Sequence, residues 1–416
     1  MIMALLVAPA ASTAQTPEPV ERVTFRDAIQ RAVEKNPSAA IAAAGILRAE
    51  ALLQQARAGA GLQVNASVTT TTLNKGVEFQ GTTVSPQNSA TGVIDITMPI
   101  YAPAAWARRT QALDQKTVAE LARADTARQT ALETADAFLT VIARRRAVET
   151  NVRARDTAQS HFELARQLQE RGTGSRLNQL RAQQELSIDE GLVEASRLAL
   201  YQAQEALGVL LAADGPVDAA DEPDFTAPEP SQNVATGLLP RSDLKLFSAE
   251  QSAAERVVRD SVKDRFPSLS ATFEPQANYP SPFFTPSRSW RFLLQLSIPV
   301  YDNGRRAGER VERESALDVA RANFTGALTR ASSEVRAARE AVASAERSLA
   351  SAQAGAGQAQ EVVAIVNISF RAGAATNIEV IDAEQRARDA DATVANAEDA
   401  LRRARLSLLN ALGLFP

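Results

Sequence analysis

Two stretches of the chain, TMPIYAPAAWARRTQA at 97–112 and SIPVYDNGRRAGERVE at 297–312, repeat one pattern 200 residues apart. In each stretch an alternation of apolar and polar residues runs into Pro-x-Tyr and then into a long charged segment. Alternation with a period of two residues is typical of a strand, and proline interrupts strand pairing. We therefore predict two strand-to-helix junctions. Their markers are Pro99, Tyr101, Pro299 and Tyr301.

The match continues along the chain, so it belongs to an internal repeat with a period of about 200 residues. Downstream, RGTGSRLNQLRAQQ at 171–184 aligns with RAGAATNIEVIDAEQ at 371–385. Each copy has the same order of helix, two strands, very long helix, turn with glycine and returning helix. We predict a first structural repeat over 15–211 and a second over 236–416. A linker rich in Pro and Asp, over 212–235, joins them.

Four segments alternate apolar and polar side chains with the period of a strand. They lie at about 62–73, 90–100, 267–276 and 289–300. A strand of about 9–11 residues is long enough to cross a bilayer. The pattern also fits a soluble hairpin packed on helices, because the membrane signal of a single strand is weak.

The other patterned segments are long helices with the Ala, Glu, Arg, Gln and Leu content of coiled coils. They lie at about 23–60, 104–171, 175–212, 236–265, 304–371 and 376–413. The helix at 104–171 would measure on the order of 100 Å, longer than a compact domain. An Ala-rich heptad stripe from Phe324 to Leu349 predicts close helix packing, although any antiparallel bundle also fits it. We expect a rod with strands at one end and Gly turns at the other.

The composition argues against several classes of function. The formal net charge is −4, so no basic surface for nucleic acid is expected. The chain has no Cys and one His, His161, so we expect no disulfide, no cofactor, no metal site and no Cys- or His-based catalysis. We expect His161 to be an ordinary exposed residue of a helix. The carboxylates have helix-surface spacings, so an enzyme finds no support.

The N-terminal segment 1–14 is apolar and has the length of a signal peptide, although the usual positive region is missing. We expect it to direct export; a disordered apolar tail is the alternative. No other stretch reaches the roughly 18 apolar residues of a membrane-spanning helix. If the chain crosses a membrane, it would do so with strands.

Taken together, these features resemble the TolC-like outer-membrane efflux protein (outer membrane factor) family over nearly the full chain. The match is carried by VTFRDAIQRAVEKNPS at 23–38, the DITMPIY and QLSIPVY junctions, the turns at 172–175 and 373–376, and the ALG that closes each half. The resemblance implies a homotrimer. Each chain would supply four transmembrane β-strands to a twelve-stranded β-barrel in the outer membrane. Its two coiled-coil hairpins would join a twelve-helix tunnel extending through the periplasm.

The resemblance also implies a function, that of a passive exit duct in a tripartite efflux pump or a type I secretion system. Its partners would be a periplasmic adaptor (membrane fusion) protein, an inner-membrane pump and outer-membrane lipid. The alternative is a non-conducting coiled-coil or adhesin rod anchored in the outer membrane. Ion conductance distinguishes the two, because a rod has no lumen.

The two Gly turns are the predicted docking tips for the adaptor, with purely structural turns as the alternative. Their residues are Gly172, Thr173, Gly174, Ser175, Gly373, Ala374, Ala375 and Thr376. Gly172 and Gly373 would provide the backbone angles of helix C-terminal caps. Ser175 and Thr376 would cap the returning helices.

The second turn is predicted to carry a periplasmic gate. Glu379 and Asp382 are three residues apart and share one face of the returning helix. The resemblance implies that carboxylates at these positions form rings at the closed entrance, which would favour cations. Family members also latch the gate with a Tyr and an Arg; here Phe370 and Ala375 stand in their places, so closure would rest on apolar packing or on Arg371. A solvated helix face is the alternative for both carboxylates.

Overall fold

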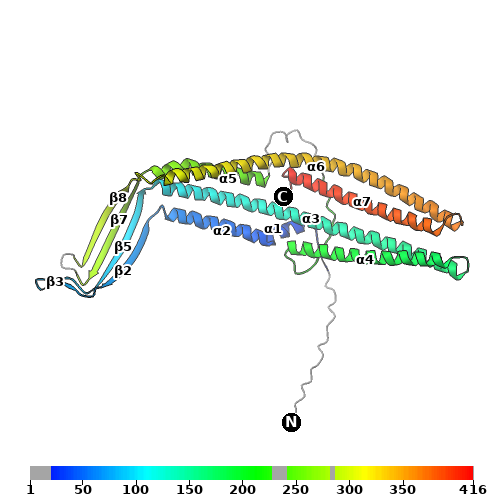
Figure 1. Ribbon diagram of the computed structural model, residues 1–416, viewed down its shortest axis with the longest axis horizontal. Coiled ribbons are helices and arrows are strands. Elements are labelled where there is room, and N and C mark those ends of the chain that lie inside the picture. Colours follow the sequence, from blue (N-terminus) through cyan, green and yellow to red (C-terminus); the bar gives the residue numbers. More distant parts are fainter. Residues whose placement is uncertain (1–19, 227–240, 282–285, 416) are drawn as a thin grey trace, which may run out of the picture. The chain divides into compact units, whose positions relative to one another are not determined.

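The computed structural model describes residues 20–226, 241–281 and 286–415. The predicted signal-peptide-like segment 1–14 and part of the predicted linker lie outside the described residues. The described chain is mainly helical and contains one four-stranded antiparallel sheet (Figure 1). No helix in this described part is long and apolar enough to span a membrane.

Four strands lie where the alternating segments predict them. They are β2 (Gln63–Thr72), β5 (Asn88–Tyr101), β7 (Ser268–Tyr279) and β8 (Arg288–Ser297). Their order in the sheet is β2-β5-β7-β8, and all three pairings are antiparallel (Figure 1). The edge strand β2 is exposed on both faces along its whole length, and β8 is exposed at nearly every residue. A small hairpin of β3 (Val77–Phe79) and β4 (Thr82–Ser85) lies between β2 and β5, where the sequence predicts a loop.

The two junction prolines do not interrupt the sheet in the same way. β8 ends at Ser297, two residues before Pro299, as the prediction requires. Pro99 instead lies inside β5 and pairs with Ser270, and an irregularity then carries the pairing on to Tyr101. The prediction that Pro99 ends the ladder is therefore wrong on the β7 side. A β-bulge gives the chain room to pass a residue that cannot donate a hydrogen bond.

Seven helices of the described chain account for most of its residues. They are α1 (Phe25–Lys35), α2 (Pro37–Ala58), α3 (Pro103–Glu170), α4 (Arg176–Leu210), α5 (Ser242–Asp260), α6 (Arg305–Arg371) and α7 (Asn377–Ala411). α3 and α6 have 68 and 67 residues, and α4 and α7 have 35 each. Helices of matching length therefore occur in both halves of the chain.

The first predicted helix, 23–60, is interrupted in the structure. α1 ends at Lys35, the next residue Asn36 has an extended backbone, and α2 begins at Pro37. A proline disfavours helical backbone angles in the residue before it and is well suited to the first position of a helix. The Asn36 Nδ2 donates a 3.0 Å hydrogen bond to the Leu210 carbonyl at the end of α4, which stabilises the break. Val23, the first residue of the predicted helix, instead ends the short strand β1 (Glu21–Val23).

The chain divides into two compact units, and each contains segments from both halves of the sequence. The first unit is Met1–Asn36, Thr130–Ala227 and Ala338–Leu408, and the second is Pro37–Gln129, Pro228–Ala337 and Leu409–Pro416. The two sequence repeats are therefore not separate compact domains. The sheet belongs to the second unit, and both Gly turns belong to the first.

The first unit has its core where α1 and the start of the predicted linker pack on α3. Phe25 lies between Phe138 and Phe225, with ring centroids 5.4 Å from each in edge-to-face geometry. The predicted linker also contains a short strand, β6 (Val217–Ala219), which pairs in parallel with β1 (Glu21–Val23). All three β6 residues are buried, so this part of the linker is ordered core.

The second unit holds a buried cation at the start of α5. Arg241 is 5% exposed, and its guanidinium lies 2.7 Å from Asp243 Oδ2 and 2.6 Å from Glu334 Oε2. The same guanidinium donates to the Ala411 carbonyl. A buried charge is tolerated only when it is paired in this way, and removing one partner typically costs about 3–5 kcal/mol.

The predicted heptad stripe in α6 is buried over its middle part. Ala331, Val335, Ala338 and Val342 are all less than a tenth exposed. Leu328 departs from the stripe, because it is 36% exposed and Ala327 beside it is buried. Since most buried positions are Ala or Val, neighbouring helices can approach closely.

Gly208 provides a test of how tightly the first unit is packed. A Cβ atom on Gly208 would lie 2.3 Å from the Gly215 carbonyl oxygen, a contact too short to exist. We expect Gly208→Ala to destabilise the protein by about 1–3 kcal/mol through overpacking. Gly191 lies in the same helix with open space around it, so Gly191→Ala should be neutral or stabilising by up to ~1 kcal/mol. Urea unfolding in detergent, followed by circular dichroism, compares the two; equal effects would contradict the packing described here.

Candidate functional site

The two turns that join the long helices have the same hydrogen-bond pattern. After α3, Thr173 N donates to the Leu168 carbonyl at 3.0 Å and Gly172 N to Gln169 at 3.0 Å. After α6, the equivalent bonds run from Ala374 N to Ser369 at 2.8 Å and from Gly373 N to Phe370 at 3.0 Å. This pair of bonds defines a Schellman motif. Gly172 and Gly373 have φ of 75° and 77°, so the predicted glycine caps are confirmed.

The returning helices begin with the predicted side-chain caps. The Ser175 hydroxyl accepts from Leu177 N at 3.1 Å. In the second turn Thr376 N donates to Glu379 Oε2 at 2.6 Å, and Glu379 N donates to the Thr376 hydroxyl at 3.4 Å. This reciprocal pair is a capping box. The hydrogen bond from the Thr376 backbone, with that from its hydroxyl, lowers the pKa of Glu379 below its ordinary value.

Gly174 differs from the other turn residues because its position admits no side chain. A Cβ atom there would lie 2.8 Å from Gln169 N and 2.9 Å from Leu168 Cβ. Substituting Gly174 would therefore distort the turn itself. Thr173 and Ala374 are exposed, so they are better positions for testing whether a partner docks at these turns.

The predicted gate residues lie on the exposed side of α7. Glu379 and Asp382 are exposed, whereas the adjacent Val380 and Ala383 are buried. Asp382 Oδ2 lies 3.0 Å from Arg386 Nη2 one turn further along the helix. Glu379 is thus held by the capping box and Asp382 by an ion pair, so both carboxylates have partners within the chain. Among the described residues, Arg371 is exposed and forms no ion pair with either carboxylate.

His161 is not the exposed residue that the sequence suggests. It is 8% exposed, and its Nε2 lies 2.6 Å from Asn377 Oδ1, at the first residue of α7. Its ring also lies 5.9 Å from the ring of Phe370, centroid to centroid. The burial follows from a neighbour 216 positions away, which no local pattern indicates. His161 therefore links α3 to the second turn, and Phe370 packs against it.

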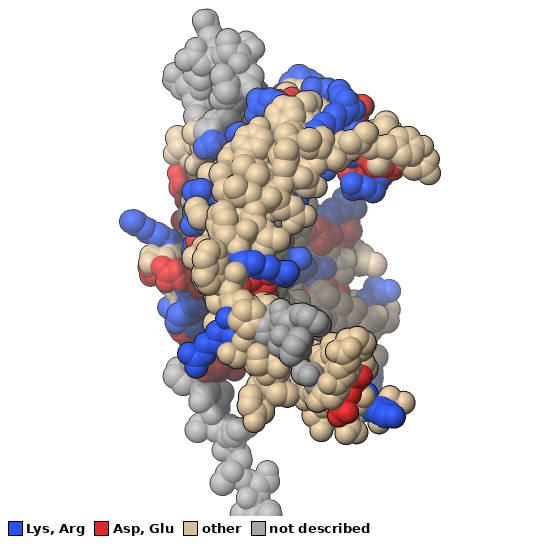
Figure 2. Space-filling model, turned by 90° about the vertical axis from the view of Figure 1, so that its left-hand side faces the viewer, with Lys and Arg blue, Asp and Glu red and all other residues tan. Residues whose placement is uncertain are grey.

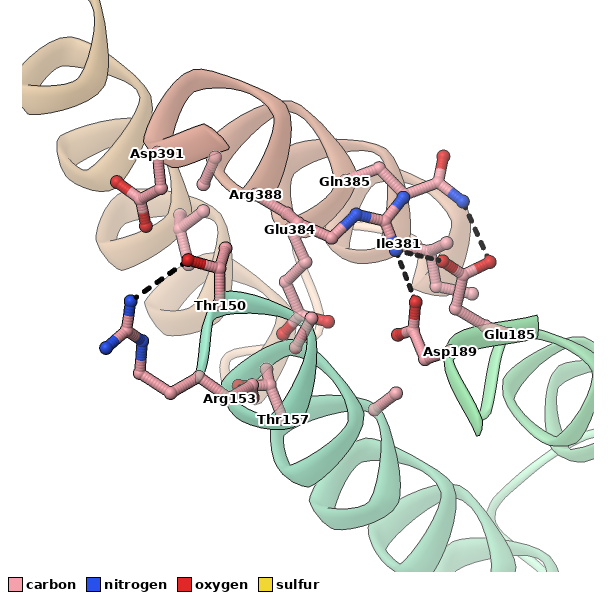
Figure 3. A pocket seen from close by; sticks show the side chains of 14 residues that line it. Thr150, Arg153, Thr157, Glu185, Asp189, Ile381, Glu384, Gln385, Arg388 and Asp391 are labelled. Atoms are coloured by element: carbon pink, nitrogen blue, oxygen red, sulfur yellow. Dashed lines mark hydrogen bonds and ion pairs between the residues drawn. The ribbon is translucent and has the colours of Figure 1, made fainter. Parts of the chain in front are cut away.

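A cavity of about 270 Å³ lies between α3, α4, α6 and α7 (Figure 3). Its lining is Thr150, Arg153, Ala154, Thr157, Ala158, Glu185, Asp189, Val363, Ile381, Glu384, Gln385, Ala387, Arg388 and Asp391. Arg388 on α7 reaches across to α4, where it forms an ion pair with Asp189 and lies 3.7 Å from Glu185 Oε1. Gln385 Nε2 donates to Glu185 Oε2 at 2.8 Å. These contacts connect the α6–α7 hairpin to the α3–α4 hairpin.

Glu384 is the carboxylate of this cavity without a hydrogen bond or ion pair among the described residues. Burial, together with the negative charges of Glu185 and Asp189, raises its pKa to about 7. Arg388, which lines the same cavity, is already paired with Asp189. The sequence analysis missed this group. Glu185 with Asp189, and Glu384 with Arg388, each have helical i, i+4 spacing shortly after a turn, which is the signal that could have shown it.

Glu384 makes the stability of the first unit depend on pH. In the folded chain the pKa of Glu384 is about 7, whereas the ordinary pKa of a glutamate is 4.5. Between these two pH values, folding is therefore accompanied by uptake of a proton. Stability therefore falls as the pH rises from about 4.5 to about 7. We expect Glu384→Gln to remove this dependence and to unfold at higher temperature than the parent at pH 8.

Thermal unfolding at pH 5 and pH 8 measures the effect. Asp391→Asn is the matched control, because Asp391 lines the same cavity at a distance from Glu185 and Asp189 (Figure 3). A parental pH dependence in Glu384→Gln would show that this carboxyl group titrates normally.

Residues 28–213 and 237–414 match the family described as outer membrane efflux protein, and the chain belongs to this family. A curated relative is outer membrane protein OprJ of Pseudomonas aeruginosa, 26% identical over 220 residues, which cover 50% of this chain and 43% of OprJ. The match thus spans less than half the length of that relative. The protein is located in the outer membrane, with a periplasmic extension.

Solved structures share the fold. The outer membrane protein VceC of Vibrio cholerae superposes with a TM-score of 0.80 at 18% identity, covering 94% of this chain and 96% of VceC. The CmeC outer membrane channel of Campylobacter jejuni has a TM-score of 0.81 at 14% identity, covering 99% of this chain and 94% of CmeC. None of the proteins named here is described as an enzyme.

Proposed function

We propose that the chain is one subunit of a trimeric exit duct in the outer membrane. The observation that carries this proposal is the open four-stranded sheet, whose edge strands β2 and β8 each pair on one side within the described chain. In lipid every backbone N–H and C=O group needs a partner, so these edges must be covered. Three copies would cover all edges by joining β8 of one chain to β2 of the next, closing twelve strands into a barrel.

The helical hairpins would then assemble in the same trimer. Each chain has a hairpin of α3 with α4 and one of α6 with α7, with near-equal helix lengths in both. Exposed apolar side chains near the turns leave these helices with faces to cover. Leu177, Leu180, Ile365, Ile368 and Ile378 are each at least half exposed. Burying such side chains against neighbouring copies would form the wall of a tunnel through the periplasm.

The duct would serve a tripartite efflux pump or a type I secretion system, through a periplasmic adaptor and an inner-membrane pump. The eight turn residues are the proposed docking tips. Support comes from the rigidity of both turns, since Schellman bonds and side-chain caps fix their backbone. A rigid, exposed turn presents its side chains in one arrangement and lowers the entropic cost of binding.

Gating is proposed for the second turn, with Glu379, Asp382, Phe370 and Arg371 as its residues. Both carboxylates would contribute charge at the entrance, and the hydrogen bonds from Thr376 favour the ionised form of Glu379. Closure would rest on the apolar contact of Phe370 with His161 rather than on a tyrosine–arginine latch. A ring of carboxylates at a narrow mouth favours cations.

A non-conducting rod anchored in the membrane is the competing function. The exit duct and the rod would have the same helices. Ion conductance in a planar bilayer distinguishes them, because a rod has no lumen. We expect the purified trimer to conduct with a preference for cations, and Glu379→Ala combined with Asp382→Ala to lose that preference. Blockade by trivalent cations should also weaken by about tenfold or more, because two charges per chain are removed.

Glu163→Ala with Glu170→Ala is the matched control, since both residues are exposed carboxylates near the first turn. An absence of conductance in the parent would favour the rod. Unchanged selectivity in the gate variant would place the constriction elsewhere.

Docking is tested by Thr173→Arg and Ala374→Arg. Both positions are exposed and lie outside the tight Gly174 contact, so the turns should keep their structure. We expect each variant to assemble and to conduct normally but to lose at least about half of drug or polypeptide export in cells, because a bulky cation would prevent close approach of the adaptor. Ser187→Arg, on an exposed face of α4, is the control. Normal export by both turn variants would leave the turns with a structural role alone.

A further inference from the structure

One end of the sheet is where all four strands meet helices. The register pairs Gln63 with Thr97 at the start of β2, and Ser268 with Ser297 at the start of β7. β5 extends to Tyr101 at the same end. The segments that leave the sheet here therefore begin at nearly the same level along the strands.

These segments have a charge unlike that of the whole chain. They are the nine-residue stretches 54–62, 102–110, 259–267 and 298–306. They contain eight Lys or Arg and three Asp, a net charge of +5, whereas the chain as a whole has −4. The connections at the opposite end, 73–87 and 280–287, contain one Lys and one Glu and so have no net charge. The positive charge is concentrated at the helix end of the sheet.

The carboxylates at this end are already neutralised. Asp260 Oδ1 lies 2.9 Å from Lys263 Nζ, Asp264 pairs with Arg313, and Asp302 pairs with Arg306. Five exposed arginines have no ion pair or side-chain hydrogen bond among the described residues. We call them the arginine collar: Arg57, Arg108, Arg109, Arg259 and Arg265. Figure 2, drawn from the side of the strands, shows Lys and Arg gathered in patches beside a largely uncharged surface.

Exposed aromatic rings accompany the collar. Tyr101, Trp106, Phe266 and Tyr301 lie in or next to the same segments and are 40%, 42%, 46% and 84% exposed. Tyr and Trp prefer the boundary between the hydrocarbon and the headgroups of a bilayer. The collar residues lie three to nine positions beyond the strand ends. At the rise of a helix, this separation places their backbone within about 15 Å of the sheet. Arginine side chains are long enough to reach back from there toward a headgroup layer.

We propose that the arginine collar binds the phosphate groups of anionic phospholipids in the leaflet from which the helices emerge. The proposal rests on the proposed function, because the sheet must span the membrane. Charge complementarity selects this occupant: a guanidinium binds phosphate oxygens through paired donors, and anionic lipids attract basic segments beside a membrane span. A zwitterionic headgroup offers the same phosphate without the net charge.

Native mass spectrometry of the detergent-purified trimer tests the collar. Phosphatidylglycerol and phosphatidylethanolamine are added in equal amounts, and bound lipids are counted. We expect phosphatidylglycerol to be retained at least about fivefold more often. Exchanging all five collar arginines for Gln should abolish this preference. The control exchanges five exposed, unpaired arginines elsewhere: Arg123, Arg181, Arg330, Arg336 and Arg339.

Three outcomes would overturn the proposal: no preference in the parent, the same loss in the control variant, or dissociation of the collar variant into monomers. The last result would mean that the arginines pair with acidic groups of a second copy. Flotation with vesicles of each lipid is measured in parallel. Failure to insert into either vesicle would contradict the proposed function, whereas insertion without lipid preference would contradict the collar alone.

Discussion

Unpaired strand edges are the constraint on which the architecture depends. A sheet of four strands leaves a row of N–H and C=O groups on β2 and another on β8. Water can satisfy these groups, but hydrocarbon cannot. In the proposed trimer, a chain located in the outer membrane would complete its sheet with other copies of itself. In the single chain β2 and β8 are exposed along nearly their whole length, as expected of edge strands that a neighbouring strand would cover.

The helical part of the chain is also built from two similar halves. Two hairpins of near-equal length come from two related halves of the sequence, but the compact units combine segments from both halves. Arg388, Gln385 and Glu185 illustrate the consequence, because they join α7 of one half to α4 of the other. The polar cavity beside them contains a carboxyl group, Glu384, that burial keeps protonated at mildly acidic pH. The hairpins are thus connected by charged and polar contacts.

Local patterns predicted the long elements and the turns well, because periodicity and glycine act over a few residues. Gly172 and Gly373 could be predicted as helix caps from residue type alone, because glycine readily adopts the positive φ that both have in the structure. The break at Asn36 could have been read from Pro37, but the surrounding helical pattern concealed it. The strand β6 is too short to show a period. His161 and Glu384 could not be placed, because partners far away in the sequence decide their burial.

The hydrogen bonds of the turns have a consequence for molecular recognition. The amide groups of Gly172, Thr173 and Gly174 all donate to carbonyls of α3, and those of Gly373, Ala374 and Ala375 donate to carbonyls of α6. A protein that approaches these turns finds no main-chain donor free at those six positions. Recognition would then depend on the remaining carbonyl groups and on the side chains, and the side chains can change while the backbone stays the same. Partner choice could therefore diverge in evolution without any change of fold.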